Sequence, residues 1–119
     1  MPEGYLTTHV LDTARGTPAA GMTVTLFRIA GDAPKQLAQM TTNGDGRTDS
    51  PILPQAQFST GLYELVFEAG AYFNRIGVPV EDPRFLDIIP IRFGISDDSS
   101  HYHVPLLVSP FGYSTYRGS

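Results

Sequence analysis

The stretch GLYELVF, residues 61–67, decides the fold class of this chain. Side chains alternate between the two faces of an extended strand. Tyr63, Leu65 and Phe67 therefore share one apolar face, while the opposite face is mixed. A strand of this kind covers a buried core on one side only. The stretch predicts a sheet that packs against a second layer.

Short segments of the same kind recur on both sides of this stretch. Twelve glycines and ten prolines separate them, and such residues favour turns. The expected strands cover residues 5–11, 22–29, 37–42, 61–67, 88–95, 101–109 and 113–117, and residues 68–76 are expected to form one short helix. Seven or eight short strands predict an all-β antiparallel sandwich, and we expect residues 1–119 to form a single domain.

Pro105 interrupts the expected strand 101–109. Proline has no N–H to donate to a β-ladder and belongs at sheet edges or bulges. We therefore expect either an edge strand at this point or a break in its register.

Composition excludes several classes of partner and site. The net charge is −4 and Lys35 is the only lysine, which argues against nucleic acid because its binding needs a basic surface. No apolar run approaches 18 residues, so we expect no membrane span. The chain has no cysteine, and this excludes disulfides and thiolate metal sites. Patterned sequence begins directly after residue 4, so we expect a cytoplasmic protein without a signal peptide.

The three histidines are the first candidates for chemistry. His101 and His103 share a strand face, and His9 could join them. A catalytic zinc site needs three protein ligands, so a zinc hydrolase that uses His9, His101 and His103 is one alternative. The other interpretation treats each histidine as a surface or hydrogen-bonded structural residue.

Arg47 directly follows the glycine-rich turn at residues 43–46. That turn can direct the guanidinium toward an anion or a carbonyl oxygen; otherwise Arg47 is a solvated loop residue. The sequence contains no phosphate-binding loop, no G-x-S-x-G and no cysteine nucleophile. The remaining groups suit activation of water beside an electrophilic carbonyl.

The C-terminal residues 110–119 contain Phe111, Tyr113 and Tyr116. Disordered tails are poor in aromatic residues, so we expect this end to be docked. The segments LTTHVLD (6–12), DGR (45–47), HVPLL (103–107) and YRGS (116–119) resemble the 5-hydroxyisourate hydrolases, the transthyretin-related enzymes of purine catabolism. These segments occur in the expected order across residues 5–119.

The resemblance implies a transthyretin-like (prealbumin-like) sandwich of two four-stranded sheets and a homotetramer with active sites in a central channel. It implies a small-molecule substrate, 5-hydroxyisourate, with hydrolysis of a ring amide and with no metal and no cofactor. By position, it implies functional roles for His9, Arg47, His103, Tyr116 and Ser119. His9 or His103 would be the general base. His101 does not carry over and keeps its structural interpretation.

A transthyretin-like carrier of a small hydrophobic ligand is the remaining alternative. A carrier would need a mostly apolar channel, whereas catalysis needs polar histidine and arginine in it. The YRGS segment at residues 116–119 and the histidines favour the enzyme branch, because the resemblance implies that hormone-carrying transthyretins lack them.

Overall fold

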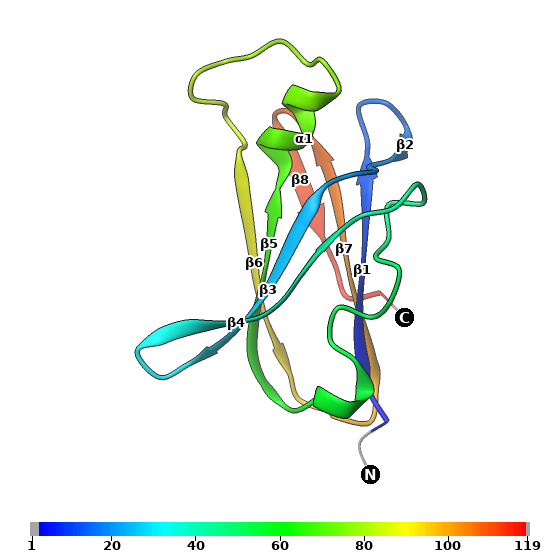
Figure 1. The fold of residues 1–119 in the computed structure, drawn as a ribbon, viewed down its shortest axis with the longest axis vertical. Helices are drawn as coiled ribbons and strands as arrows, with labels where there is room; N and C mark the ends of the chain where they lie inside the picture. The colour runs from blue at the N-terminus through cyan, green and yellow to red at the C-terminus, as the bar shows by residue number, and fades with distance from the viewer. Residues whose placement is uncertain (1–2, 119) are drawn as a thin grey trace.

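The computed structural model describes residues 3–118, which form two four-stranded sheets packed against each other (Figure 1). The first sheet has the order β2-β1-β7-β8 and the second has the order β4-β3-β5-β6. The first contains β1 (Tyr5–Asp12), β2 (Thr17–Pro18), β7 (His101–Ser109) and β8 (Gly112–Thr115). The second contains β3 (Thr23–Ala30), β4 (Ala33–Thr41), β5 (Gly61–Glu68) and β6 (Ile88–Ile95). The prediction of an all-β sandwich of two four-stranded sheets is confirmed.

Period-two alternation builds the core between the two sheets. In β5, the predicted face of Tyr63, Leu65 and Phe67 is fully buried. On the opposing sheet, Leu6 in β1 and Leu106 in β7 are equally buried. Full burial of such a side chain contributes about 1.5–3 kcal/mol to folding. The outward residues of β1 and β7 are consequently free for a role other than packing.

One strand pair departs from the antiparallel prediction. Strand β1 runs parallel to β7, with Tyr5 opposite His101 and Thr7 opposite His103, whereas the other strand pairs are antiparallel. A parallel neighbour cannot be joined by a short hairpin, and most of the chain lies between these two strands. The pairing therefore brings the beginning of the chain against its end.

A short helix, α1 (Ala69–Arg75), directly follows β5 and lies at one end of the sandwich (Figure 1). It agrees with the helix expected at residues 68–76. The Tyr72 hydroxyl donates a 2.8 Å hydrogen bond to Oδ2 of the buried Asp12 at the end of β1. This bond ties the helix to the first sheet. Within residues 3–118, no helix is long and apolar enough to cross a membrane.

Pro105 lies inside the first sheet rather than at its edge. Its register with β1 is unbroken, and Pro105 is opposite His9. On the other side, β8 pairs with β7 only as far as Leu106 opposite Thr115. Pairing resumes at His103 opposite Gly118, in the same register. Because proline lacks the donor, the β8 ladder lapses there, and the expectation of an edge or a register break is wrong.

Candidate active site

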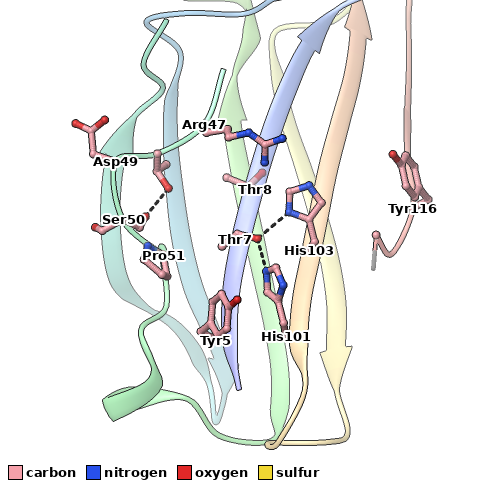
Figure 2. Close-up of a pocket in the computed structure, with 12 residues that line it drawn as sticks. Tyr5, Thr7, Thr8, Arg47, Asp49, Ser50, Pro51, His101, His103 and Tyr116 are labelled. Carbon is pink, nitrogen blue, oxygen red and sulfur yellow. Dashed lines mark hydrogen bonds between the residues drawn. The ribbon is translucent and has the colours of Figure 1, made fainter. Parts of the chain in front are cut away.

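A pocket of about 560 Å³ lies on the outer face of the first sheet (Figure 2). Its walls come from β1, β7, the loop after residue 46 and the C-terminal segment. The lining residues are Tyr5, Thr7, Thr8, Arg47, Thr48, Asp49, Ser50, Pro51, His101, His103, Tyr116 and Gly118. Most of them are polar. Strand β1, the loop after residue 46 and the last part of the chain therefore converge on one polar cavity.

The Thr7 hydroxyl lies at the centre of this pocket. It is 2.6 Å from Nε2 of His101 and 2.7 Å from Nδ1 of His103. The ring of Tyr5 stacks on His101 with a centroid distance of 4.1 Å and an interplanar angle of 10°. The parallel register of β1 and β7 produces this arrangement, since opposed residues share a face.

The backbone geometry of the turn at residues 43–46 places Arg47 over the pocket. The Asn43 side-chain oxygen accepts hydrogen bonds from the backbone of Asp45 and of Arg47, at 2.9 and 3.2 Å. Gly46 has a φ of +76°, which favours glycine, and a side chain there would overlap the Val10 carbonyl oxygen. The Val10 N–H donates to the Gly46 carbonyl at 2.8 Å. The turn is thereby fixed against β1, where the backbones of Arg47 and His9 form an isolated antiparallel β-bridge.

The Arg47 side chain is exposed. Among the residues that the structure describes, it forms no hydrogen bond or ion pair, although its backbone is held in the turn. Figure 2 shows it extending toward His103 above Thr7. A planar guanidinium offers five N–H donors in a fixed fork. These donors remain available to a ligand in the pocket.

The environment of His103 favours its neutral form. Burial lowers the pKa of His103, and the positive charge of Arg47 and the neighbouring His101 and His9 lower it further. A neutral imidazole has one nitrogen with a free lone pair. At neutral pH, His103 can therefore accept a proton.

His9 lies beside the pocket but does not line it. Its ring centroid is 6.5 Å from that of His103. Burial lowers the pKa of His9, as does the Arg47 charge, while a backbone hydrogen bond and the charge of Asp45 oppose the shift. His9 is thus a second neutral imidazole close to the first.

The C-terminal segment closes one wall through backbone contacts with His103. The Gly118 N–H donates to the His103 carbonyl at 2.7 Å, and a Cβ on Gly118 would lie 2.7 Å from His103 Cδ2. The Arg117 guanidinium lies 3.9 Å from the ring centroid of buried Tyr102. Tyr116, the first residue of this segment after β8, lines the pocket. The expectation of a docked C-terminal segment agrees with these contacts up to Gly118.

The residues selected from the sequence therefore have different positions. Arg47, His103 and Tyr116 line the pocket, His9 lies next to it, and Ser119 is outside the described residues. Sequence reasoning missed Tyr5, Thr7 and the loop of residues 48–51, and it assigned His101 only a structural or zinc-ligand role. The alternation of β1 places Tyr5, Thr7 and His9 on one face, but it does not indicate which strand lies beside them.

The zinc alternative finds no ligand cluster in the structure. Within residues 3–118, no group of three or more His, Cys, Asp or Glu side chains is arranged to hold a metal ion. His101 and His103 instead direct one nitrogen each at the Thr7 hydroxyl.

Sequence comparison identifies relatives across almost the whole chain. A model of the HIUase/Transthyretin family matches residues 6–118. The 5-hydroxyisourate hydrolase 2 of Rhizobium meliloti (strain 1021) is 60% identical over 116 residues, which cover 98% of this chain and 97% of that protein.

Solved structures agree with this relationship. (S)-Allantoin synthase superposes with a TM-score of 0.91 at 45% identity over 98% of this chain, which spans only 44% of that protein. The 5-hydroxyisourate hydrolase of Klebsiella pneumoniae gives a TM-score of 0.80 at 40% identity, covering 97% of this chain and 99% of that one. Transthyretin from Sparus aurata gives a TM-score of 0.84 at 27% identity, covering 95% of each chain. The predicted transthyretin-like fold is confirmed.

Proposed function

This chain belongs to the HIUase/Transthyretin family, and we propose that it is a 5-hydroxyisourate hydrolase. The product of the reaction is 2-oxo-4-hydroxy-4-carboxy-5-ureidoimidazoline. The similarity of this chain to the Rhizobium meliloti hydrolase supports the assignment, since the two are 60% identical over an alignment that covers 98% of this chain. We place this reaction in purine (urate) catabolism.

The geometry of Arg47 and His103 is the observation that carries this proposal. A guanidinium without a side-chain partner in residues 3–118 and an imidazole with a lowered pKa line the same polar pocket. Hydrolysis of a cyclic amide requires a base for the attacking water and a positive group for the oxygen that becomes charged. The pocket supplies both from the protein itself.

The reaction then follows in two steps. A neutral imidazole, of His103 or His9, takes a proton from water as the hydroxide attacks the ring amide carbonyl. The guanidinium of Arg47 binds the planar ring and stabilises the negative charge that develops on the carbonyl oxygen. The carbon–nitrogen bond then breaks as the imidazolium returns its proton to the leaving nitrogen. The six-membered ring opens to a carboxylic acid, which loses its proton to solvent.

Tyr116 and Ser119 complete the proposed set. Tyr116 lines the pocket, and its hydroxyl can donate to the substrate or orient it. Ser119 is assigned from the family resemblance, and its hydroxyl or terminal carboxylate can pair with a histidine or guide the water. Appending a C-terminal tag tests this assignment, because the tag displaces the carboxylate and should lower the rate.

The direct test is an absorbance assay with freshly generated 5-hydroxyisourate. The purified chain should accelerate its loss well above spontaneous decay, and His103→Ala should remove most of that acceleration. Decay at the spontaneous rate with the intact chain would overturn the proposal.

The reaction needs no metal in this proposal, because protein groups provide the base and the positive charge. Full turnover is expected to persist after exhaustive chelation. Stoichiometric zinc whose removal abolishes activity would instead favour the alternative that uses His9, His101 and His103. The carrier alternative is disfavoured because polar residues line most of the pocket, whereas a carrier of hydrophobic ligands needs an apolar one.

We also propose a homotetramer. A second cavity of about 220 Å³ lies between β6 and the end of β8, lined by apolar residues including Ile91, Phe93 and Val104. Both strands are sheet edges, and exposed edges are normally covered. Sedimentation at micromolar concentration should give four times 13.0 kDa; an active monomer would contradict the assignment.

We place the protein in the cytoplasm, since a chain without cysteine fits a reducing compartment. Fractionation of the native host should recover the activity with cytoplasmic markers. Recovery with periplasmic or membrane fractions would show that this placement is wrong.

A further inference from the structure

Thr7 joins two imidazoles that come from the same strand. Its hydroxyl oxygen is 2.6 Å from His101 Nε2 and 2.7 Å from His103 Nδ1, and Figure 2 draws both bonds. Because Thr7 lies on β1 and both histidines lie on β7, the parallel register holds the three side chains on one face. The contact therefore follows from the strand pairing of the sheet.

The number of protons in this contact limits the states of the two rings. A threonine hydroxyl has one proton to donate and two lone pairs to accept with, and a neutral imidazole has one N–H and one acceptor nitrogen. If one ring donates its N–H to the Thr7 oxygen, the hydroxyl proton can satisfy the other ring. The tautomer of His103 is then coupled to that of His101.

The two coupled arrangements differ in their consequence for catalysis. If the hydroxyl donates to His103 Nδ1, the proton of neutral His103 is on Nε2, and that nitrogen cannot act as a base. If His103 Nδ1–H donates to the hydroxyl, Nε2 keeps its lone pair. In the described part of the chain, the side-chain hydrogen bond of His103 is made through Nδ1, so Nε2 is available to the pocket.

We propose that Thr7 and His101 are positioning residues that hold His103 in its Nδ1–H tautomer, with Thr7 donating onward to His101 Nε2. This inference rests on the proposed function, in which His103 is a candidate base. It selects His103 over His9 as the group that activates water. It also gives His101 a role through His103 rather than as a zinc ligand.

His101 is suited to accept a hydrogen bond from the Thr7 hydroxyl because the ring of His101 is itself held in place. Tyr5 stacks on it at 4.1 Å with nearly parallel planes. Without the acceptor on His101, the Thr7 hydroxyl could turn and donate to His103 Nδ1, which stabilises the wrong tautomer. Positioning of an imidazole by a hydrogen bond to Nδ1–H is a general device of hydrolytic sites.

The charged groups around His103 are consistent with uncharged hydrogen-bond partners, Thr7 and His101, on its Nδ1 side. Arg47 from the loop, His9 from β1 and His101 from β7 all act to lower its pKa, while Asp49 contributes to the wall of the pocket. A Thr–His pair orients the ring without adding a negative charge at Nδ1, which would raise the pKa of the base.

Two pairs of substitutions separate the hydrogen bonds from the packing. Thr7→Val removes the hydroxyl and keeps the shape, whereas Thr7→Ser keeps the hydroxyl. His101→Phe keeps a ring to stack on Tyr5 and removes the nitrogen, whereas His101→Gln retains an acceptor oxygen on the side chain. We expect Thr7→Val and His101→Phe each to lower kcat by about tenfold or more, with KM little changed. Thr7→Ser should retain more of the rate than Thr7→Val, and His101→Gln should retain more than His101→Phe.

The double variant and the imidazole nitrogens supply the decisive readouts. Thr7→Val combined with His101→Phe should be no slower than either alone, because groups that act as one unit are not additive. Heteronuclear NMR of the ring nitrogens should show His103 as Nδ1–H in the wild type and as Nε2–H or a mixture in both single variants. The acid limb of the kcat profile should shift in the same variants.

The outcomes distinguish this inference from the proposed function. A wild-type His103 in the Nε2–H form, or a Thr7→Val chain with full kcat and an unchanged tautomer, would overturn the inference while the hydrolase assignment stands. If the wild type fails to open 5-hydroxyisourate, the proposed function is wrong, and the NMR measurement still decides whether Thr7 and His101 set the tautomer.

Discussion

The outer faces of the two sheets carry similar residues but differ in how those residues are held. On the second sheet, Arg92 from β6 pairs with Glu64 from β5 at 3.2 Å, and 57% of the Arg92 side chain is exposed. Over the first sheet, Arg47 lines a pocket together with His101 and His103, and its side chain has no partner within residues 3–118. The composition of a polar face is thus a poor guide to function. A better guide to function is the convergence of separate segments around hydrogen-bond donors that have no protein partner.

Deleting residues 116–119 should have the largest effect on this contrast. The segment supplies Tyr116 to the pocket wall and Gly118 to the His103 backbone, while β7 and β8 remain. Activity is expected to be lost, and the melting temperature should fall only slightly. Assays of truncated and full chains with parallel thermal scans test this. A fully active truncated chain would show that the C-terminal segment has no role in catalysis.

Arg47→Ala should lower kcat/KM by about a hundredfold or more, because it removes the positive group beside the carbonyl oxygen. The matched control is Arg92→Ala on the second sheet, which should leave the rate unchanged. Both arginines are exposed, so neither change should cost more than about 1 kcal/mol of folding free energy. Equal losses of activity in the two variants would contradict the distinction between the faces.

Gly118→Ala should lower kcat by about tenfold, since a displaced base loses much of its contribution to proton transfer. The added Cβ would lie 2.7 Å from His103 Cδ2 and must displace the ring or the segment. Gly94→Ala is the control, because a Cβ there meets only Leu62, at 3.9 Å. Wild-type rates for Gly118→Ala would mean that the segment does not position His103.

The pH dependence should show an acid limb below pH 6.5. Catalysis needs a neutral imidazole, and burial and Arg47 lower the pKa values of His103 and His9 from 6.5. The rate therefore falls as pH drops through the lowered value. Stability follows the same sign, because the unfolded chain binds more protons in this window, so the free energy of unfolding also decreases on acidification.

Replacing Arg47 by Ala should move that limb upward, toward 6.5, because one of the charges that lowers both pKa values is lost. An NMR titration of the histidine rings measures this even in a slow variant. A limb that stays in place would show that the Arg47 charge does not lower these pKa values.

Glu64→Gln should have the smallest effect. Exposed ion pairs contribute about 0–1 kcal/mol and are screened by salt. The free energy of unfolding should change by less than about 1 kcal/mol, with the activity unaltered. A loss of activity here would indicate that the second sheet also takes part in function.

Much of the secondary structure was accessible from local patterns. Strands expected at residues 88–95 and 101–109 match β6 and β7, because alternation and the flanking turns are both local. The start of β4 was missed by four residues: it begins at Ala33 rather than at residue 37. Pro34 and Lys35 lie in an exposed hairpin end where no core pattern marks the strand.

The site was accessible only in part, for the same physical reason. Family resemblance selected Arg47, His103 and Tyr116, which line the pocket. Thr7 carries no sequence signal of its own, because a threonine on a strand is ordinary. Its significance comes from the two imidazoles that flank it.

The sequence by itself determined which residues share a face, since the period of two follows from the covalent geometry of an extended chain. It therefore placed His101 beside His103, and Thr7 beside His9. Only the tertiary structure decided that β1 lies parallel to β7, that the turn at Gly46 returns to Val10, and that Pro105 separates β8 from the C-terminal segment. The choice of strand partner depends on how both sheets bury their apolar faces together, so no single segment contains that information.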